Sequence, residues 1–256
     1  LHSVEVLKFA NIVSLAGSIS INQDRMRTFR YGMLPVLVLL AISAVLLYFQ
    51  PNFSAVVTLA LLVFVMVLVG GANLLQFAVM GVLGIAGGVV AMVATDYRIN
   101  RILAFTDPWK YSGDLSYQLI QSMYSIGSGG LFGLGLGNSR QKFLYLPYSE
   151  SDCIFAIIVE ELGYVGGLAV LVVFGLLIWR GVRIALRAPN TFGMMLATGI
   201  TGLIAIQVFI NIGVVTGLVP PTGVVLPFIS AGRTSLIMFM GSIGVLLNIS
   251  RQTRAV

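Results

Sequence analysis

Apolar runs of about 20 residues recur along almost the whole chain, and they constrain its fold more than any other feature. The runs lie at residues 5–21, 31–49, 53–70, 75–95, 153–179, 192–214 and 234–249. A helix of that length crosses the hydrocarbon core of a bilayer and satisfies its own backbone groups, which lipid cannot do. The pattern therefore predicts an all-α polytopic membrane protein, a bundle of about seven spanning helices.

The composition excludes several other classes of protein. Hydrophobic residues make up 58% of the 256 residues and charged residues 9%, whereas soluble domains carry about 25% charged residues. We therefore expect residues 1–256 to form a single membrane domain. The only cysteine, Cys153, cannot form an intrachain disulfide, and the only histidine is His2. Without a Cys/His cluster we predict no metal-ligating residues, so catalysis must rest on carboxylates, Arg/Lys or a bound ion.

Three short basic clusters predict the orientation of the chain in the membrane. They are "DRMRTFR" at 24–30, "RGVRIALR" at 180–187 and "RQTRAV" at 251–256. Four predicted spans separate the first cluster from the second and two separate the second from the third, so all three fall on one side. The positive-inside rule makes that side cytoplasmic. The net charge of +6 then follows from topology and requires no nucleic-acid partner.

The same count of predicted spans places two unusual segments on the outer side. Residues 96–152 form a long extracellular loop, whose aromatic and apolar residues favour a folded loop packed over the bundle. Residues 217–235 contain three prolines and cannot continue a helix. Irregular backbone at membrane depth is tolerated only where protein or a water-filled cavity covers it. A partly buried polar site on the outer face is therefore expected.

Several motifs give the chain a family resemblance. The stretches "GLGLGNSRQKFLYLP" (133–147) and "SDCIFAIIVEELGYVGG" (151–167) resemble the SEDS family of shape, elongation, division and sporulation proteins, closest to its FtsW/SpoVE branch. Further matches are "DPW" (107–109), "YQLIQSMYSIGSGG" (117–130), "TGVVLPFIS" (222–230) and "LLNISR" (246–251). The resemblance covers nearly the whole chain. It implies a fragment that lacks about three N-terminal helices of a ten-helix fold.

The resemblance implies an activity. Family members are peptidoglycan glycosyltransferases that polymerise lipid II on the outer face of the bacterial cytoplasmic membrane, beside a class B penicillin-binding protein. The implied partners are therefore lipid II, that protein and membrane lipids. The family's essential aspartate, at the lip of a helix, corresponds to Asp152. Its implied role is that of the general base for the attacking 4-hydroxyl. The pyrophosphate leaving group needs neutralisation by Arg, Lys or a divalent cation such as Mg or Mn.

Each candidate residue also has a plainer interpretation. Ser151 and Asp152 suit an ordinary helix start. Arg140, Lys142 and Arg233 either bind the pyrophosphate or contact lipid headgroups by snorkelling. Gln118 and Ser139 lie in matched stretches, and we take them as candidate substrate-binding residues.

Four charged residues are interpreted as structural: Glu5, Lys8, Glu160 and Glu161. The two adjacent glutamates are expected about 12 Å along a continuous helix from Asp152, where an intramembrane carboxylate usually faces the bundle interior. The aromatics Trp109, Tyr117, Tyr124 and Tyr145 fit a membrane-interface belt better than a sugar platform.

Departures from the family pattern keep two other functions open. Tyr148 and Asn52 replace family carboxylates, Cys153 follows the aspartate, and Arg233 stands where the family has small residues. A non-catalytic scaffold for a penicillin-binding protein would explain these changes. A lipid II flippase would instead use Glu160 and Glu161 near the midplane. Division, sporulation and elongation all remain possible roles.

Overall fold

A computed structural model describes residues 3–48, 53–93, 103, 105–110, 116–144 and 151–252. These residues form helices joined by turns and irregular segments, and none of them lies in a strand. The all-α prediction is confirmed.

Each of the seven predicted apolar runs forms a helix. The helices are α1 (Ser3–Ile21), α2 (Leu34–Tyr48), α3 (Phe53–Val69), α4 (Leu74–Val93), α8 (Ile154–Leu186), α9 (Thr191–Val215) and α10 (Arg233–Gln252). Two short elements, η1 (Gln23–Arg25) and η2 (Phe29–Met33), precede α2. Within the described ranges, five stretches are long and apolar enough to cross a membrane: α1, Phe29–Leu47, α8, α9 and α10. The apolar parts of α3 and α4 are shorter.

The chain divides into two compact units. The first unit comprises Leu1–Gly88, Leu177–Ile206 and Arg233–Val256, and the second comprises Val89–Leu176 and Gln207–Gly232. Helices α8 and α9 each contribute residues to both units. The single membrane domain expected over residues 1–256 stays a prediction.

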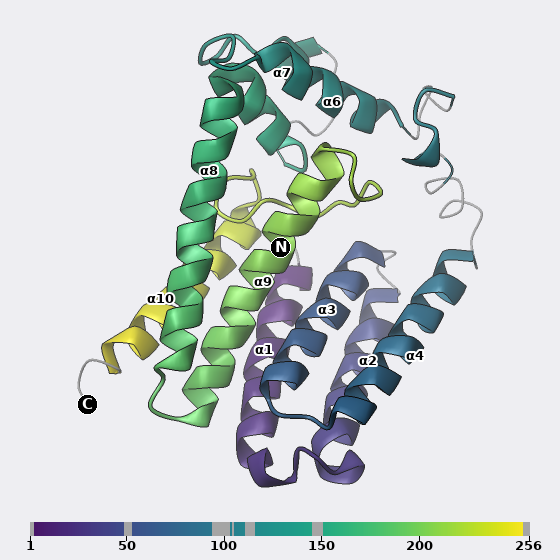
Figure 1. The fold of residues 1–256 in the computed structure, drawn as a ribbon, viewed down its shortest axis with the longest axis vertical. Helices are drawn as coiled ribbons and strands as arrows, with labels where there is room; N and C mark the ends of the chain where they lie inside the picture. The colour runs from purple at the N-terminus through teal and green to yellow at the C-terminus, as the bar shows by residue number, and fades with distance from the viewer. Residues whose placement is uncertain are drawn as a thin grey trace. The chain divides into compact units, whose positions relative to one another are not determined.

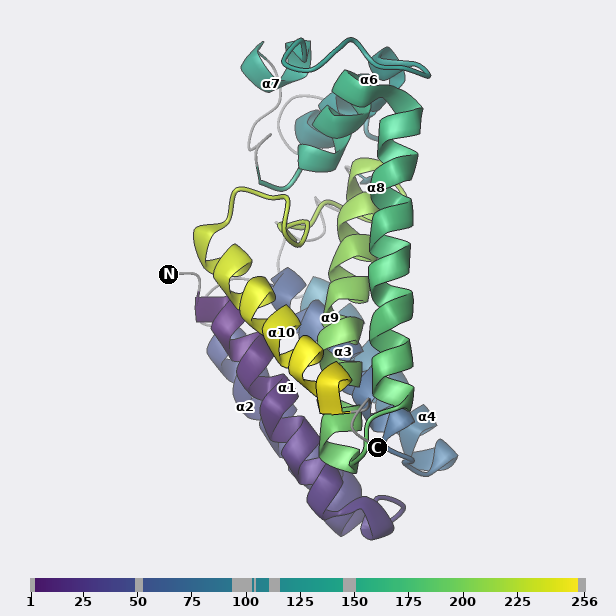
Figure 2. The same ribbon diagram turned by 90° about the vertical axis from the view of Figure 1, so that its left-hand side faces the viewer.

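In the first unit, α1 is the central helix. It packs against α2, α3 and α10, and Figures 1 and 2 show it beside these helices. Ile12 and Leu15 on α1 and Leu59 on α3 are fully buried there. The rings of Phe64 and Phe77 stack with centroids 3.9 Å apart and join α3 to α4.

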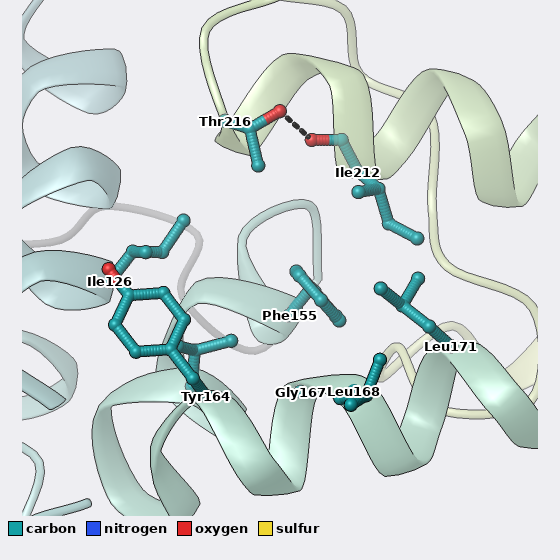
Figure 3. A pocket seen from close by; sticks show the side chains of 9 residues that line it. Ile126, Phe155, Tyr164, Gly167, Leu168, Leu171, Ile212 and Thr216 are labelled. Carbon is teal, nitrogen blue, oxygen red and sulfur yellow. Dashed lines mark hydrogen bonds between the residues drawn. The ribbon is translucent and has the colours of Figure 1, made fainter. Parts of the chain in front are cut away.

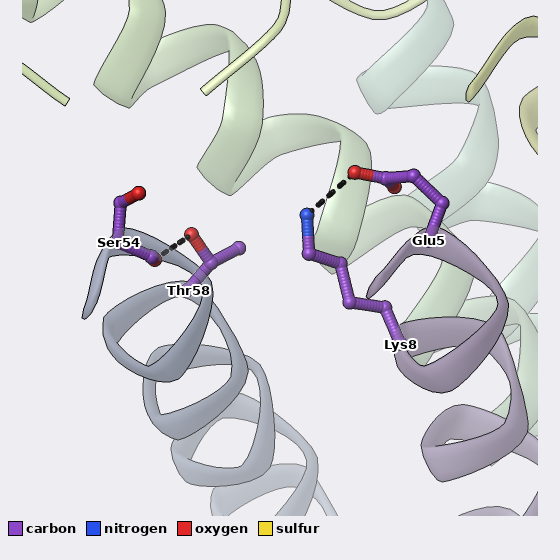
Figure 4. A network of polar contacts seen from close by, with 4 residues as sticks. All are labelled: Glu5, Lys8, Ser54 and Thr58. Carbon is purple, nitrogen blue, oxygen red and sulfur yellow. Dashed lines mark hydrogen bonds and ion pairs between the residues drawn. The ribbon is translucent and has the colours of Figure 1, made fainter. Parts of the chain in front are cut away.

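The first unit also buries an ion pair. Glu5 and Lys8 lie one turn apart on α1, and the Lys8 Nζ donates to Glu5 Oε1 at 2.8 Å (Figure 4). Their side chains are only 9% and 5% exposed. A buried charge is tolerated when it is paired, so the contact explains how α1 keeps two charged residues in an apolar bundle.

The second unit contains the described part of the predicted outer loop. It includes α6 (Tyr117–Gly129) and the short α7 (Arg140–Leu144). Helix α6 runs along the start of α8, where the Ser125 hydroxyl donates to the Ala156 carbonyl at 3.1 Å. The loop is therefore folded, as predicted, over its described residues. The proline-containing segment between α9 and α10 is also non-helical, as predicted.

Helix α8 reverses direction, which corrects the prediction of a continuous helix over 153–179. Gly163 has φ 71° and ψ −175°, outside the helical region. A Cβ built on Gly167 would lie 3.7 Å from the Phe155 ring, although 12 residues of straight helix span about 18 Å. Figure 3 shows Phe155 opposite Gly167 and Leu168. We call residues 154–162 the first arm and residues 164–186 the second arm.

Main-chain hydrogen bonds hold this reversal. The amides of Leu134 and Gly135 donate to the carbonyls of Glu160 and Glu161 at 2.9 and 3.0 Å, and the Tyr164 amide donates to the Gly130 carbonyl at 2.9 Å. The loop thus supplies partners for carbonyls that a continuing helix would have paired. A positive φ at Gly163 favours glycine because a Cβ is strained in that conformation.

An apolar crevice of about 380 Å³ lies inside the second unit. Both arms of α8 line it, together with Ile126 of α6 and with Ile212 and Thr216 near the end of α9 (Figure 3). Thr216 offers no free donor to the crevice, since its hydroxyl donates to the Ile212 carbonyl of its own helix at 2.7 Å.

Candidate functional site

Asp152 occupies a turn immediately before the first arm of α8, and its side chain is half-buried. Its main-chain carbonyl accepts a hydrogen bond from Asn211 Nδ2 at 2.8 Å. The same nitrogen donates to the Val224 carbonyl at 2.7 Å. Asn211 lies on α9 and is only 1% exposed. One buried amide therefore connects the Asp152 turn to the segment that follows α9.

Ser230 makes a second connection beside the first. Its hydroxyl donates to the Ser151 carbonyl at 2.5 Å and accepts from the Leu226 amide at 2.8 Å. The Ser230 amide in turn donates to the Leu226 carbonyl at 3.1 Å, which closes a short loop. Phe228, inside that loop, has a φ of 66°, a conformation that is rare for a bulky residue and often marks a functional segment.

The Asp152 carboxylate faces this segment. A Cβ built on Gly223 would lie 3.5 Å from Asp152 Oδ2, so the Gly223 main chain forms one wall beside the carboxylate. Gly223 contributes no side chain to this wall.

Helix α6 supports the turn from another direction. The buried Cys153 thiol accepts from Gln118 Nε2 at 3.1 Å and from the Ser122 hydroxyl at 3.4 Å. Gln118, predicted to bind substrate, therefore contacts the residue adjacent to Asp152. Side chains from α6 and α9 and the segment after α9 converge on the three residues of the turn.

Glu160 is the centre of a separate polar cluster at the end of the first arm. Its carboxylate is 1% exposed. It accepts from the hydroxyls of Ser139 at 2.6 Å and Ser125 at 3.0 Å, and from the Arg140 amide at 3.1 Å. Ser139 also caps α7, since its hydroxyl accepts from the Lys142 amide at 3.0 Å. Glu160 thus joins α6, α7 and α8.

The chain is helical from Ile154 to Glu160, as the sequence prediction assumed, and it reverses three residues later, at Gly163. Glu160 contacts the loop and α7 there. Its depth in the membrane stays a prediction. The adjacent Glu161 is half-buried.

The cationic candidates are distributed over both units. The Arg140 side chain is exposed although its main chain is anchored by Glu160, and Lys142 is half-buried. Arg233 is exposed at the start of α10, in the first unit. Glu5 and Lys8 also lie in the first unit and pair with each other.

The aromatic candidates Trp109 and Tyr124 form an edge-to-face pair with ring centroids 5.8 Å apart. Tyr117 is half-buried at the start of α6. Tyr145, Tyr148, Glu150 and Asn52 lie outside the described residues.

The described ranges contain no group of three or more His, Cys, Asp or Glu side chains placed to hold a metal ion. The divalent cation that the family resemblance allows at the pyrophosphate stays a prediction.

Sequence reasoning missed Asn211 and Ser230. Asn211 is a polar residue within the apolar run 192–214, and such residues are often functional. That signal was available in the sequence. The partners of Asn211 could not be predicted, because the two carbonyls that it binds lie 59 and 13 residues away along the chain.

Comparisons with known proteins agree with this architecture. Residues 1–255 match the FtsW/RodA/SpoVE family, described as cell cycle proteins. The chain is 45% identical over 250 residues to stage V sporulation protein E of Bacillus subtilis, which covers 98% of this chain and 68% of the relative. It is 40% identical over 250 residues to a probable peptidoglycan glycosyltransferase FtsW of Geobacter sulfurreducens, with 98% and 67% covered.

Two solved structures are similar along nearly the whole chain. The first is described as "Structural coordination of polymerization and crosslinking by a peptidoglycan synthase complex". It matches with a TM-score of 0.80 and 26% identity, covering 99% of this chain and 70% of that one. The second, a mutant of the rod shape determining protein RodA of Thermus thermophilus, matches with a TM-score of 0.67 and 25% identity, covering 98% and 66%. The chain therefore belongs to the FtsW/RodA/SpoVE family of cell cycle proteins.

Proposed function

We propose that this protein is a peptidoglycan glycosyltransferase that polymerises lipid II in cell division or sporulation, with Asp152 as the general base. Homologues named as peptidoglycan glycosyltransferases and the similarity to a peptidoglycan synthase complex support the reaction class. The observation that carries the assignment to Asp152 is its setting. It is a half-buried carboxylate in a turn that hydrogen bonds from α6, α9 and the segment after α9 hold in place.

The chemistry requires one base and neutralisation of the leaving group. The 4-hydroxyl oxygen of the acceptor GlcNAc attacks the anomeric carbon of the donor MurNAc, and its proton passes to the Asp152 carboxylate. The bond from that carbon to the pyrophosphate breaks at the same time, and undecaprenyl pyrophosphate leaves with the electron pair. The anomeric configuration inverts from α to β. A positioned base of this kind contributes about 10²–10⁴-fold to the rate.

The cations of α7 are suited to receive the pyrophosphate. Glu160 holds the Arg140 main chain, which leaves the guanidinium exposed. The anchor lies about 9 Å along the first arm from Ile154, six residues at 1.5 Å each. Asp152 therefore lies next to the start of the first arm, and the Glu160 carboxylate that anchors Arg140 lies near its end. Arg140 and Lys142 would bind the leaving group there, Arg in a bidentate manner and Lys as a point charge.

The proposed setting is the outer face of the bacterial cytoplasmic membrane, with a class B penicillin-binding protein as partner. The similarity to a complex for polymerisation and crosslinking supports a partner of that kind. Lipid II is the substrate that fits both the reaction and an active site placed in a membrane protein.

The decisive test is polymer formation from labelled lipid II by the full-length protein with its partner. Wild type is compared with Asp152→Asn, which keeps size and hydrogen bonding but removes the base. Asp24→Asn, an exposed aspartate of η1, is the matched control for loss of one negative charge. We expect polymer from wild type and from Asp24→Asn, and at least about a 100-fold loss in Asp152→Asn.

The other outcomes are equally informative. Equal polymer from wild type and Asp152→Asn would remove Asp152 from the mechanism. No polymer from the wild type, with partner binding intact, would favour the scaffold. Transfer of lipid II across vesicle membranes without polymer would favour the flippase.

A further inference from the structure

We propose that Asn211 is a positioning residue for the reaction, and that its side-chain amide sets where the Asp152 carboxylate stands relative to the Gly223–Val224 wall. This inference rests on the proposed function, because it assigns Asn211 a role through Asp152. Asn211 itself donates hydrogen bonds to two main-chain carbonyls of the protein.

The orientation of the Asn211 amide follows from its partners. Both contacts of Nδ2, at 2.8 and 2.7 Å, are main-chain carbonyl oxygens, which only accept hydrogen bonds. An amide nitrogen carries two hydrogens, and these two carbonyls use both of them. A flipped side chain would place Oδ1 against two acceptors. The contacts therefore admit a single orientation.

The two carbonyls belong to the two sides of the candidate site. One is that of Asp152 itself, and the other is that of Val224, adjacent to Gly223, whose main chain faces Asp152 Oδ2. Asn211 thus connects the turn that carries the carboxylate to the wall beside it through one side-chain amide. That amide is on a helix and belongs to a residue only 1% exposed, so few neighbouring groups can take its place.

Both described hydrogen bonds of the Asn211 side chain are donated by Nδ2. Asn211 Oδ1 is buried and has no hydrogen-bond partner within the described ranges. A residue of similar size that cannot donate should therefore lose both connections. The Ser230 contact to Ser151 would remain, so the turn would shift without the fold being lost.

A shifted base changes the chemical step more than substrate binding. A misplacement of about 1 Å can lower a rate by about 100-fold. Substrate affinity depends on the cations and on lipid contacts, which Asn211 does not touch. The expected signature is a fall in kcat of about 10- to 100-fold with KM within about threefold of wild type.

The test uses the full-length protein with its partner and lipid II. Asn211→Leu removes the amide at similar volume, and Asn211→Asp keeps the shape while losing both donors when ionised. Asn11→Leu is the matched control, because Asn11 is also a buried helical asparagine, 2% exposed, but lies on α1 in the first unit. Ser230→Ala weakens the neighbouring connection alone and serves if the Asn211 variants do not fold.

A second readout reports on the turn without requiring activity. Cys153 follows Asp152 directly and is 1% exposed, so N-ethylmaleimide should modify it slowly in wild type. Peptide mass spectrometry measures that rate. We expect at least about tenfold faster modification in Asn211→Leu, in proportion to opening of the turn. The rate in Asn11→Leu should be that of wild type at equal melting temperature.

The outcomes separate the inference from the proposed function. A folded Asn211→Leu with wild-type kcat, a loss confined to KM, or unchanged Cys153 modification would each overturn the positioning role. A loss of kcat in Asn11→Leu as large as that in Asn211→Leu would also overturn it. Equal polymer formation by wild type and Asp152→Asn would instead contradict the proposed role of Asp152 as base, whatever the Cys153 modification rates are. If Ser230→Ala is the only variant that folds, its kcat and Cys153 modification rate are compared with wild type. Unchanged values would overturn the proposal that hydrogen bonds to the Ser151–Cys153 turn position Asp152.

Discussion

The few acidic side chains of this chain differ in what surrounds them. Asp152 is half-buried and its main chain is fastened from α9. Glu160 is fully buried and its carboxylate accepts from three donors, while Glu5 pairs with Lys8. Glu160 and Glu5, whose carboxylates are buried and hydrogen-bonded or paired, are interpreted as structural groups, whereas Asp152 is the proposed base. Burial and position thus separate carboxylates that composition counts alike.

Glu160→Gln tests the structural interpretation at this scale. The amide offers one acceptor oxygen in place of two and directs its NH2 group toward donors, so buried hydroxyl and amide groups lose partners. We expect the free energy of unfolding to fall by about 1–3 kcal/mol, measured by denaturant unfolding in detergent micelles.

The adjacent Glu161→Gln is the matched control, because Glu161 is only half-buried. Its effect should stay within about 0.5 kcal/mol. Equal stability of the two variants would show that the hydrogen bonds of Glu160 do not stabilise the fold.

Residues were predictable from the sequence where a motif marked them. The resemblance identified Asp152 by number, and the structure places it at a helix start that is consistent with either interpretation. Asn211 and Ser230 were not predicted, because each acts on main-chain carbonyls brought close only by the fold. Pairwise contacts of that kind leave no local pattern in the sequence.

At the scale of elements, the apolar runs predicted all seven apolar helices but not the reversal within α8. Apart from Glu160 and Glu161, the run that contains Gly163 continues with apolar residues on both sides, so the run does not end at the break. What determines the break is a backbone conformation and the loop that pairs with it. A glycine ten residues after the start of the predicted helix was the available signal, since glycine commonly ends helices.

Gly163→Ala adds only a methyl group, but we expect it to destabilise the fold strongly. The Cβ would collide with the Leu131 carbonyl oxygen, and the φ of 71° is strained for alanine. We expect a loss of about 1–3 kcal/mol in the free energy of unfolding, measured as above.

Gly175→Ala, on the second arm of the same helix, is the control. Nothing lies within 4 Å of a Cβ built there, so helix propensity should make it neutral or stabilising by up to about 1 kcal/mol. Equal effects at the two glycines would contradict the reversal.

At the scale of the whole molecule, the basic clusters predict which ends of the helices face the cytoplasm. The second arm of α8 has about 23 residues, or about 35 Å of helix, which is enough to cross a bilayer. Its end near Leu186 carries the arginines of 180–187, whereas the loop of Leu136 adjoins its beginning.

Cysteine labelling tests this orientation. Leu136 and Leu186 are 76% and 78% exposed, so a cysteine at either position should react freely where the reagent reaches it. In spheroplasts, a membrane-impermeant maleimide should label Leu136→Cys directly and Leu186→Cys only after permeabilisation. The parent chain, whose Cys153 is buried, gives the background. The opposite pattern would reverse the orientation and move the proposed site to the cytoplasmic side.

The main-chain pairing between residues 130–135 and 160–165 has a consequence for how this region can evolve. Because the joint uses amides and carbonyls, it does not depend on the identity of most side chains around it. Leu131 and Phe132 are 67% and 81% exposed, so their substitution leaves the joint intact. The glycines at 130, 133, 135 and 163 have no such freedom, because each has a positive φ that is strained for other residues. Substitution can therefore change the exposed side chains of the loop while these glycines keep its backbone path, so relatives can differ in surface chemistry on the same fold.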